Sequence, residues 1–380
     1  MRKIRVIIGG WQTLVLVLLL MCGRSEAGII FHFTDGTAGG MNAAALAAFN
    51  RAGSYYSSAL SNSMDVNLEI SLTAQSGVVT GGAAPDMLSS SYSGFRSAIV
   101  GRSTSADDAS FVGSLPSGSS FNPYINYTLN NPAGVGSATA YVDNTIDANN
   151  QTIEMTRANA KALGLIAATD SARDGRVELD STVSWDFDPT DGIDSGKFDF
   201  TAAAAREIGV VMGFFSGVEV LDLNSGVVPD PSSVPTYYND FTFDNVAPLD
   251  FTRFTAASEA AGADIDWTAG TGARYFSVDG GATVLIADAW STGTAQGDGF
   301  LPRYWRDGAG LGLMSPNLLA GQAGGGLSAN DLRAFDVLGY SLTLSAVPEP
   351  GSFVALAMIG SVVIGYRLRR RAAKCEQHSA

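Results

Sequence analysis

Apolar and polar residues alternate along one early stretch of the chain. Val66, Leu68, Ile70 and Leu72 stand at every second position. A period of two places these side chains on one face of a half-buried β-strand. The Ala-rich stretch just before it, residues 41–60, has helical character. We therefore predict a helix followed by an amphipathic strand, which is how an α+β layer begins.

The most apolar of the predicted helices begins near residue 201. A run of alanines is followed by Ile208 and by further aliphatic and aromatic residues up to Phe215. Apolar side chains lie nearly all round such a helix, which predicts a helix in the core of the domain. We expect Asp199 or Thr201 to cap its beginning and Gly217 to end it.

Further elements follow from turn and cap residues. Between residues 77 and 132 the chain is rich in Ser, Gly and Asn, which predicts extended loops around short strands. No stretch has the composition of a linker, so we expect one ectodomain over residues 28–346. The remaining predictions are a helix from Thr156 to Leu163 ended by Gly164, a strand over 177–183, a hairpin over 274–287, and a last helix that starts at Ser328 and ends at Gly339.

Residues 1–27 have the pattern of a secretory signal peptide. Basic residues come first, an apolar run follows, and Ser25-Glu26-Ala27 gives the small residues after which a signal peptidase cuts. Two alternatives stay open. Cys22 suggests a lipoprotein, although Met21 stands where a lipobox requires a small residue, and the segment could also remain as an uncleaved anchor.

The C-terminal end, residues 347–380, carries three features in a fixed order. A Pro-Glu-Pro motif precedes an apolar run and then a basic cluster; the residues are Pro348, Glu349, Pro350, the run 353–366, and Arg369, Arg370 and Arg371. This order resembles a PEP-CTERM sorting signal, with a transmembrane helix and a positive stop on the cytoplasmic side. The resemblance implies an inner-membrane-tethered precursor that an exosortase-type enzyme processes. The alternative is an ordinary single-span anchor.

Cysteine and histidine counts exclude several chemistries. Both cysteines, Cys22 and Cys375, lie near the chain ends, so the middle has no thiol for a disulfide, a nucleophile or a zinc site. Of the two histidines, only His32 lies in the ectodomain, and His378 is in the tail. A site with two histidine ligands therefore cannot form within one folded domain. We expect His32 to be a polar side chain with a partner and not a ligand.

Charge narrows the choice of partners. Charged residues make up 16% of the chain, hydrophobic residues 46%, and the net charge is −14. Residues 1–27 and 348–380 each carry +3, which leaves −20 on the middle. So acidic a surface repels nucleic acid and anionic lipid and suits an extracytoplasmic protein.

Several segments together resemble one protein family. The stretch 207–219 reads Glu-Ile-Gly, then Gly-Phe, then Ser-Gly-Val-Glu, and is similar to the active helix of PEP-CTERM-sorted bacterial metalloproteases. Segments 185–192 (WDFDPTDG), 277–283 (SVDGGAT) and 313–316 (LMSP) resemble that family too. The resemblance implies an α+β, zincin-like domain, with a mixed sheet packed on the central helix.

The zinc ligands of that family are absent from their places. Zincin helices carry H-E-x-x-H, in which two histidines bind zinc and the glutamate acts as general base. Here the three places hold Arg206, Glu207 and Val210, and Tyr304 stands where a further histidine is common. The arginine repels a metal ion, the valine has no lone pair, and the phenol would have to lose a proton with a pKa of about 10. Zinc binding is therefore not expected.

Two residues keep a recognisable place in this pattern. Glu207 corresponds to a vestigial general base, whose alternative role is an ion pair with Arg206, and Met314 resembles the methionine turn below the metal of metzincin-like proteases. Without a Lewis acid, one carboxylate gives little hydrolytic power. We predict a pseudo-metalloprotease with a binding or structural role in the cell envelope or extracellular matrix. The alternative is an active zinc-dependent endopeptidase.

Carboxylates offer the remaining candidate ligands. An acidic loop contains Asp186, Asp188, Asp191 and Asp194, enough oxygen atoms for a structural calcium ion, although the spacing misses the EF-hand pattern. Turn formation by Asp and Gly with solvated charges is the competing interpretation. A second set, Glu207, Glu219 and Asp222, would favour Ca²⁺ or Mg²⁺ over zinc.

Overall fold

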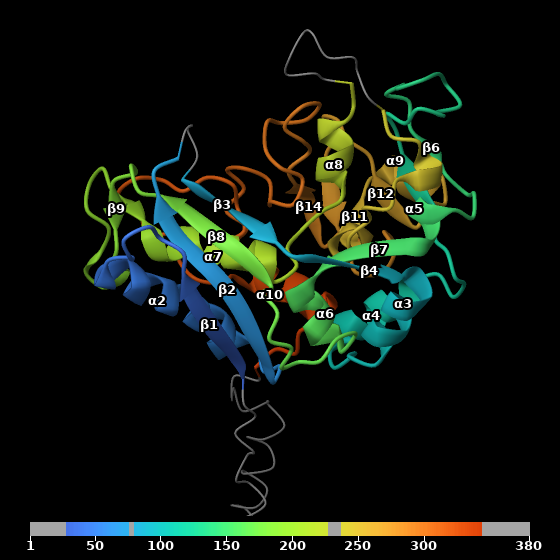
Figure 1. Cartoon of the computed structure of the whole chain (residues 1–380). Helices are drawn as coiled ribbons and strands as arrows, with labels where there is room; N and C mark the ends of the chain where they lie inside the picture. Colours follow the sequence, from blue (N-terminus) through green and yellow to red (C-terminus); the bar gives the residue numbers. More distant parts are fainter. Residues whose placement is uncertain (1–27, 76–79, 227–236, 344–380) are drawn as a thin grey trace, which may run out of the picture. The chain divides into compact units, whose positions relative to one another are not determined.

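The computed structural model describes residues 28–75, 80–226 and 237–343 (Figure 1). Contacts join the described residues up to Leu342 into one compact unit. Across these ranges, no helix combines the length and apolarity needed to cross a membrane. The predicted signal peptide and the predicted sorting tail lie outside the described residues.

A four-stranded mixed sheet organises the first half of the domain. Its order is β1-β2-β8-β3, where β1 spans Ile29–Asp35, β2 Met64–Thr73, β8 Gly175–Asp180 and β3 Gly81–Pro85. The first three strands run parallel, and β3 pairs antiparallel with β8 at the edge. Burial alternates along β2 as its sequence predicts, because one face of the sheet packs on helices. The predicted mixed sheet and α+β character are confirmed.

Two helices lie against this sheet. Helix α2 (Ala43–Ala59) contacts β1, and α7 (Phe200–Val211) contacts β3 and β8. The helices also contact each other, and the Tyr56 hydroxyl on α2 donates to the Ala205 carbonyl on α7 at 2.8 Å. Every residue of α7 is buried, as expected for a helix with apolar side chains nearly all round it. The prediction of a core helix is confirmed.

The end of α7 differs from the prediction. Asp199 caps the helix by accepting from the Ala202 amide at 3.0 Å, but the last helical residue is Val211 and not one near Gly217. Gly213 follows with a φ of 111°, a conformation that costs glycine little and stops the helix. A separate helix, α8 (Val218–Leu223), begins after Gly217.

The segment 77–132 is also more ordered than its composition suggests. It contains α3 (Tyr92–Val100) and α4 (Ala106–Ser114) besides its strands. Ser91 caps α3, and Ser105 and Asp108 form a capping box on α4. These caps and a few buried aromatic side chains outweigh the small polar residues, so the prediction of extended loops was wrong there.

Other predicted boundaries are confirmed or shift by a few residues. Thr156 caps α6 (Arg157–Leu163), Gly164 ends it with a φ of 77°, and Ser328 caps α10 (Ala329–Val337). The predicted hairpin is the antiparallel pair β13 (Arg274–Phe276) and β14 (Ile286–Trp290). The smaller elements are β4 (Met87–Ser91), β5 (Pro123–Ile125), β6 (Tyr141–Val142), α5 (Ala148–Gln151), β7 (Thr152–Thr156), β9 (Trp185–Asp186), β10 (Phe198–Asp199), β11 (Arg253–Phe254), α9 (Ala256–Ala260) and β12 (Ile265–Trp267), with 3-10 turns at Pro189–Asp191, Asp240–Thr242 and Pro248–Thr252.

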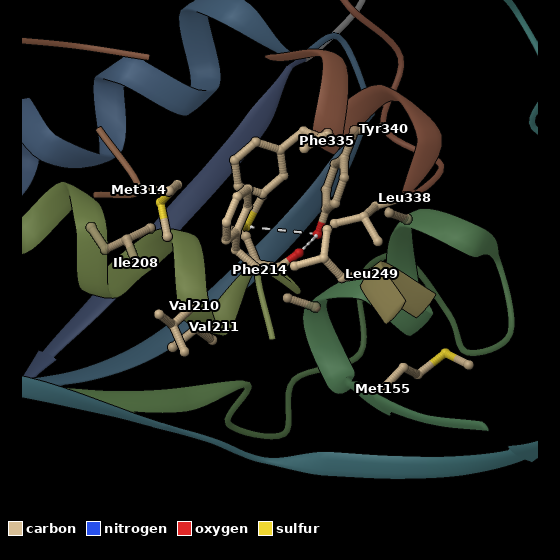
Figure 2. Packing of buried hydrophobic residues seen from close by; sticks show 14 of the residues in the cluster. Met155, Ile208, Val210, Val211, Phe214, Leu249, Met314, Phe335, Leu338 and Tyr340 are labelled. Atoms are coloured by element: carbon tan, nitrogen blue, oxygen red, sulfur yellow. Dashed lines mark hydrogen bonds between the residues drawn. The ribbon is translucent and has the colours of Figure 1, made fainter. Parts of the chain in front are cut away.

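The core lies around the end of α7. Figure 2 shows Phe214 between the helix and Phe335, whose ring centroid is 5.7 Å away. Tyr340, just after α10, donates from its hydroxyl to the Met212 carbonyl at 2.7 Å. Residues near the C-terminal end of the described domain therefore hold the end of α7 in place.

The first and last described segments meet at the turn between α2 and β2. Ile29 pairs with Met64 in the sheet, and Leu60 forms a bridge with Leu342. The Ser61 amide donates to the Ser341 carbonyl at 2.8 Å. The first and last described residues of the domain therefore lie at the same place, beside the turn between α2 and β2.

Candidate functional site

A buried ion pair occupies the middle of α7. The Arg206 Nε donates to Glu207 Oε1 at 3.0 Å, and the two side chains are 5% and 2% exposed. Burying two charges is costly, and their mutual attraction repays that cost only if their other polar atoms also find partners. The guanidinium has such partners on two further segments.

Arg206 connects α7 to two segments distant in the sequence. Nη1 donates to the Pro316 carbonyl at 2.5 Å, and Nη2 donates to the Thr80 hydroxyl at 3.3 Å. Burial by itself lowers the pKa of the Arg206 guanidinium, but the charge of Glu207 and its hydrogen bond outweigh burial and raise that pKa. Arg206 is therefore a permanent cation that joins the helix to the turn after Met314 and to the start of β3.

Tyr304 lies beside this cation. The Arg206 Cζ is 5.6 Å from the centre of the Tyr304 ring, a cation–π distance. Burial, followed by the charge of Glu207, raises the pKa of Tyr304 to about 12. The phenol therefore keeps its proton at neutral pH and is a poor metal ligand in this place.

A second ion pair lies next to the first. The Nε and Nη2 of Arg303 donate to the two carboxylate oxygens of Glu219. The Arg303 Cζ is 5.2 Å from the centre of the Phe215 ring. Burial opposes the charge on Arg303, but Glu219 outweighs it and raises the pKa of the guanidinium. Each of the two arginines is thus neutralised by its own glutamate.

Figure 2 shows Met314 and Val210 on different sides of α7, and both side chains are fully buried. A Cβ at Gly209 would be 2.6 Å from the Met314 Sδ, so only glycine allows the methionine to approach the helix so closely. The structure therefore brings Arg206, Tyr304 and Met314 together around α7, and it places Val210 in the core.

The predicted acidic ligands are engaged in turns and pairs. Asp186 accepts from the Asp194 and Asp188 amides at 3.0 and 3.1 Å, which lowers its pKa. Asp188 caps the turn that contains Asp191, and Asp194 pairs with Lys197 at 2.6 Å. In the ranges that the structure describes, no three Asp, Glu, His or Cys side chains converge as a metal site requires. Calcium binding stays a prediction.

The second carboxylate set is divided between separate partners. Glu207 is bound by Arg206 and Glu219 by Arg303. Asp222 accepts from the Ala295 and Gln296 amides at 2.8 and 2.9 Å and so holds a distant loop. Each carboxylate thus has its own structural contact.

Sequence analysis missed three residues of this site. Arg303 and Thr80 contact it, and so does the carbonyl of Pro316. Arg303 directly precedes Tyr304, so its position gave a signal that could have been used. Thr80 and Pro316 gave none, because their part depends on the path of the chain.

Comparison with known proteins identifies the C-terminal end. Residues 346–371 match the PEP-CTERM protein-sorting motif. The chain is thus a PEP-CTERM-sorted, exported protein that an exosortase-type enzyme processes at the envelope. The matched range contains the predicted Pro348-Glu349-Pro350 motif and the basic cluster. No curated protein and no solved structure matches the chain.

Proposed function

We propose that the ectodomain of this PEP-CTERM protein is a non-catalytic binding or structural module built on a zincin-like scaffold. The observation that carries the proposal is the position of Arg206. Its guanidinium is bound to Glu207, the carboxylate that would otherwise act as general base. A cation of the protein itself therefore lies where the family resemblance would place a metal ion.

The arrangement around α7 supports the scaffold part of the proposal. The helix packs on β3, the antiparallel edge strand of a mixed sheet, and Met314 lies against Gly209. Both features agree with the resemblance of segments 207–219 and 313–316 to metalloproteases of the zincin type.

The chemistry of the site supports the non-catalytic part. Hydrolysis of a peptide needs a polarised carbonyl and an activated water, and a metal ion supplies both. Arg206, Val210 and Tyr304 offer no pair of neutral ligands, and Glu207 already neutralises an arginine. What remains is an acidic, exported domain, for which the cell envelope or the extracellular matrix is the expected location.

The zinc content of the purified protein tests this proposal. After dialysis, we expect the full-length protein in a mild detergent to hold far less than equimolar zinc and to leave casein intact. Zinc is measured by elemental analysis, and cleavage by gel electrophoresis with and without a chelator. Chelator-sensitive cleavage at a rate that the bound zinc explains would instead establish the alternative, a zinc-dependent endopeptidase.

Processing of the tail is tested by tags at both ends. We expect the mature protein to lose a tag placed after Ala380, because cleavage near Pro348-Glu349-Pro350 removes everything behind it. The matched control replaces these three residues by alanine, which should keep the C-terminal tag on the protein. If the unaltered protein also kept its tag, a permanent anchor would remain as the explanation.

A further inference from the structure

A cavity of about 440 Å³ lies where the two ends of the described domain meet. The turn between α2 and β2 forms one wall, α6 forms another, and Ser341 closes it from the C-terminal side. Its polar lining consists of Ser61, Asn62, Ser63, Arg102, Lys161 and Ser341. The volume suits a small ligand, and the hydroxyl and amide groups suit a polar one.

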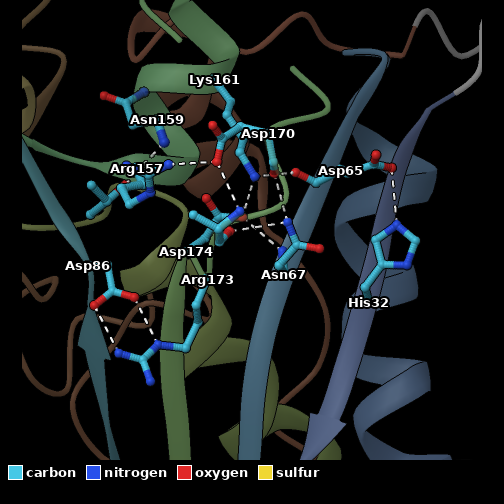
Figure 3. Close-up of polar contacts among 12 residues, drawn as sticks. His32, Asp65, Asn67, Asp86, Arg157, Asn159, Lys161, Asp170, Arg173 and Asp174 are labelled. Carbon is cyan, nitrogen blue, oxygen red and sulfur yellow. Dashed lines mark hydrogen bonds and ion pairs between the residues drawn. The ribbon is translucent and has the colours of Figure 1, made fainter. Parts of the chain in front are cut away.

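The floor of the cavity is electrically neutral. Lys161 is fully buried, and its Nζ donates to Asp174 Oδ2 at 2.6 Å and to the Asp65 carbonyl at 3.0 Å (Figure 3). Asp174 Oδ2 also accepts from the backbone amide of Asn67 at 2.8 Å. The ammonium and the carboxylate cancel each other, so this pair gives the cavity no net charge.

Arg102 gives the cavity its positive charge. Within the described ranges its guanidinium forms neither an ion pair nor a hydrogen bond, unlike most arginines of this domain. Its Nη2 lies beside Gly164, where a Cβ would be 2.6 Å away, so glycine at this helix end leaves room for the side chain. Of the described residues that line the cavity, none carries a carboxylate. The domain as a whole is acidic, so a cavity that has an arginine and no carboxylate in its lining is where an anionic group is attracted.

The place of the cavity suggests where the anion comes from. Ile29 follows the predicted signal peptide, and Leu342 precedes the sorting tail by a few residues. On the exported topology of the proposed function, on which this step rests, only residues 343–352 separate Leu342 from the apolar run 353–366 that the membrane holds during processing. The phosphates of lipid headgroups are then the most abundant anions nearby. The negative charge of the domain disfavours anionic lipids, so a zwitterionic headgroup fits best.

We propose that this cavity binds the phosphate of a zwitterionic phospholipid headgroup, with Arg102 as the cation that holds it. A guanidinium suits this role because its forked donors match two phosphate oxygens. Ser63 lies on the same wall, and its hydroxyl can donate to a remaining oxygen. Ser61 and Asn62 already donate to the Ser341 and Gly339 carbonyls at 3.2 and 3.4 Å, so they hold the shape of the wall.

Binding of a soluble headgroup tests the proposal. The probe is glycerophosphoethanolamine, added to the full-length protein in an uncharged maltoside detergent and followed by calorimetry. Because the probe has no acyl chains, the apolar tail of the protein adds nothing to the signal. We expect saturable binding that Arg102→Gln weakens about tenfold or more, since one charge-assisted contact is lost.

Two control variants make the test specific. Arg102→Lys keeps the charge and should retain most of the affinity. Arg176→Gln removes an exposed arginine of β8 that does not line the cavity, and it should leave binding unchanged. Equal weakening by Arg176→Gln would mean non-specific attraction and would overturn the proposal, as would the absence of binding by the unaltered protein.

Inorganic phosphate separates the two sources of the anion. If it binds as tightly as the headgroup at the Arg102 site, the lipid assignment is wrong and a soluble phosphate is the ligand. Weaker binding of inorganic phosphate supports the headgroup. These measurements do not depend on zinc or on tail processing, so their failure is distinguishable from failure of the proposed function.

Discussion

Replacing Arg206 by alanine is expected to lower the free energy of unfolding by about 3–5 kcal/mol. The change would leave Glu207 as a buried carboxylate without its cation, and it would leave the Pro316 carbonyl and the Thr80 hydroxyl without their donor. Urea unfolding of the full-length protein in detergent, followed by tryptophan fluorescence, measures the loss.

The matched control removes both charges together. The double variant Arg206→Met, Glu207→Gln keeps similar volumes and leaves no unpaired charge, so it should cost only about 1–2 kcal/mol, chiefly for the lost contact to Pro316. If the alanine variant cost no more than the double variant, the ion pair would not have the structural role that its burial indicates.

Restoring the missing ligands is expected to produce a zinc protein. The triple variant Arg206→His, Val210→His, Tyr304→His places imidazoles at the three positions where the resembling family binds metal. Met314 and Glu207 stay in place near them. We expect binding of equimolar zinc with about micromolar affinity or tighter, which corresponds to roughly 8 kcal/mol or more. Zinc should also raise the midpoint of thermal unfolding of this variant, because the metal binds only the folded state.

A triple alanine variant at the same three positions is the control, since it removes the same side chains and adds no ligand. Cobalt provides an independent readout, because a tetrahedral site with nitrogen ligands absorbs visible light when it holds Co²⁺. The proposed zincin-like arrangement would be contradicted by a triple histidine variant that folds, as circular dichroism would show, yet takes up no more metal than the alanine control.

The sequence determined those elements whose signals are local. Apolar and polar residues alternate along β2 and specify a strand. Thr156 and Ser328 specify the starts of two helices, and the apolar side chains all round α7 specify a core helix. The end of α7 was harder to predict, because Gly213 and Gly217 are both able to stop a helix and only packing chooses between them. Helices α3 and α4 were missed because Ser91 and Ser105, the serines that cap them, stand in a segment of many serines.

The sequence alone also determined the sorting signal and the metal-binding chemistries that are excluded. A sorting motif is a linear signal, so its residues suffice to identify it. With one histidine and no cysteine in residues 28–346, a metal site with two histidine ligands or a thiolate ligand is excluded there whatever the fold. The tertiary structure alone decided which distant groups Arg206 contacts. Arg206 reaches Thr80 across 126 positions and the Pro316 carbonyl across 110, and no periodicity or spacing predicts such contacts. The same holds for the cavity at Arg102, because its walls come from segments that only the folded chain brings together.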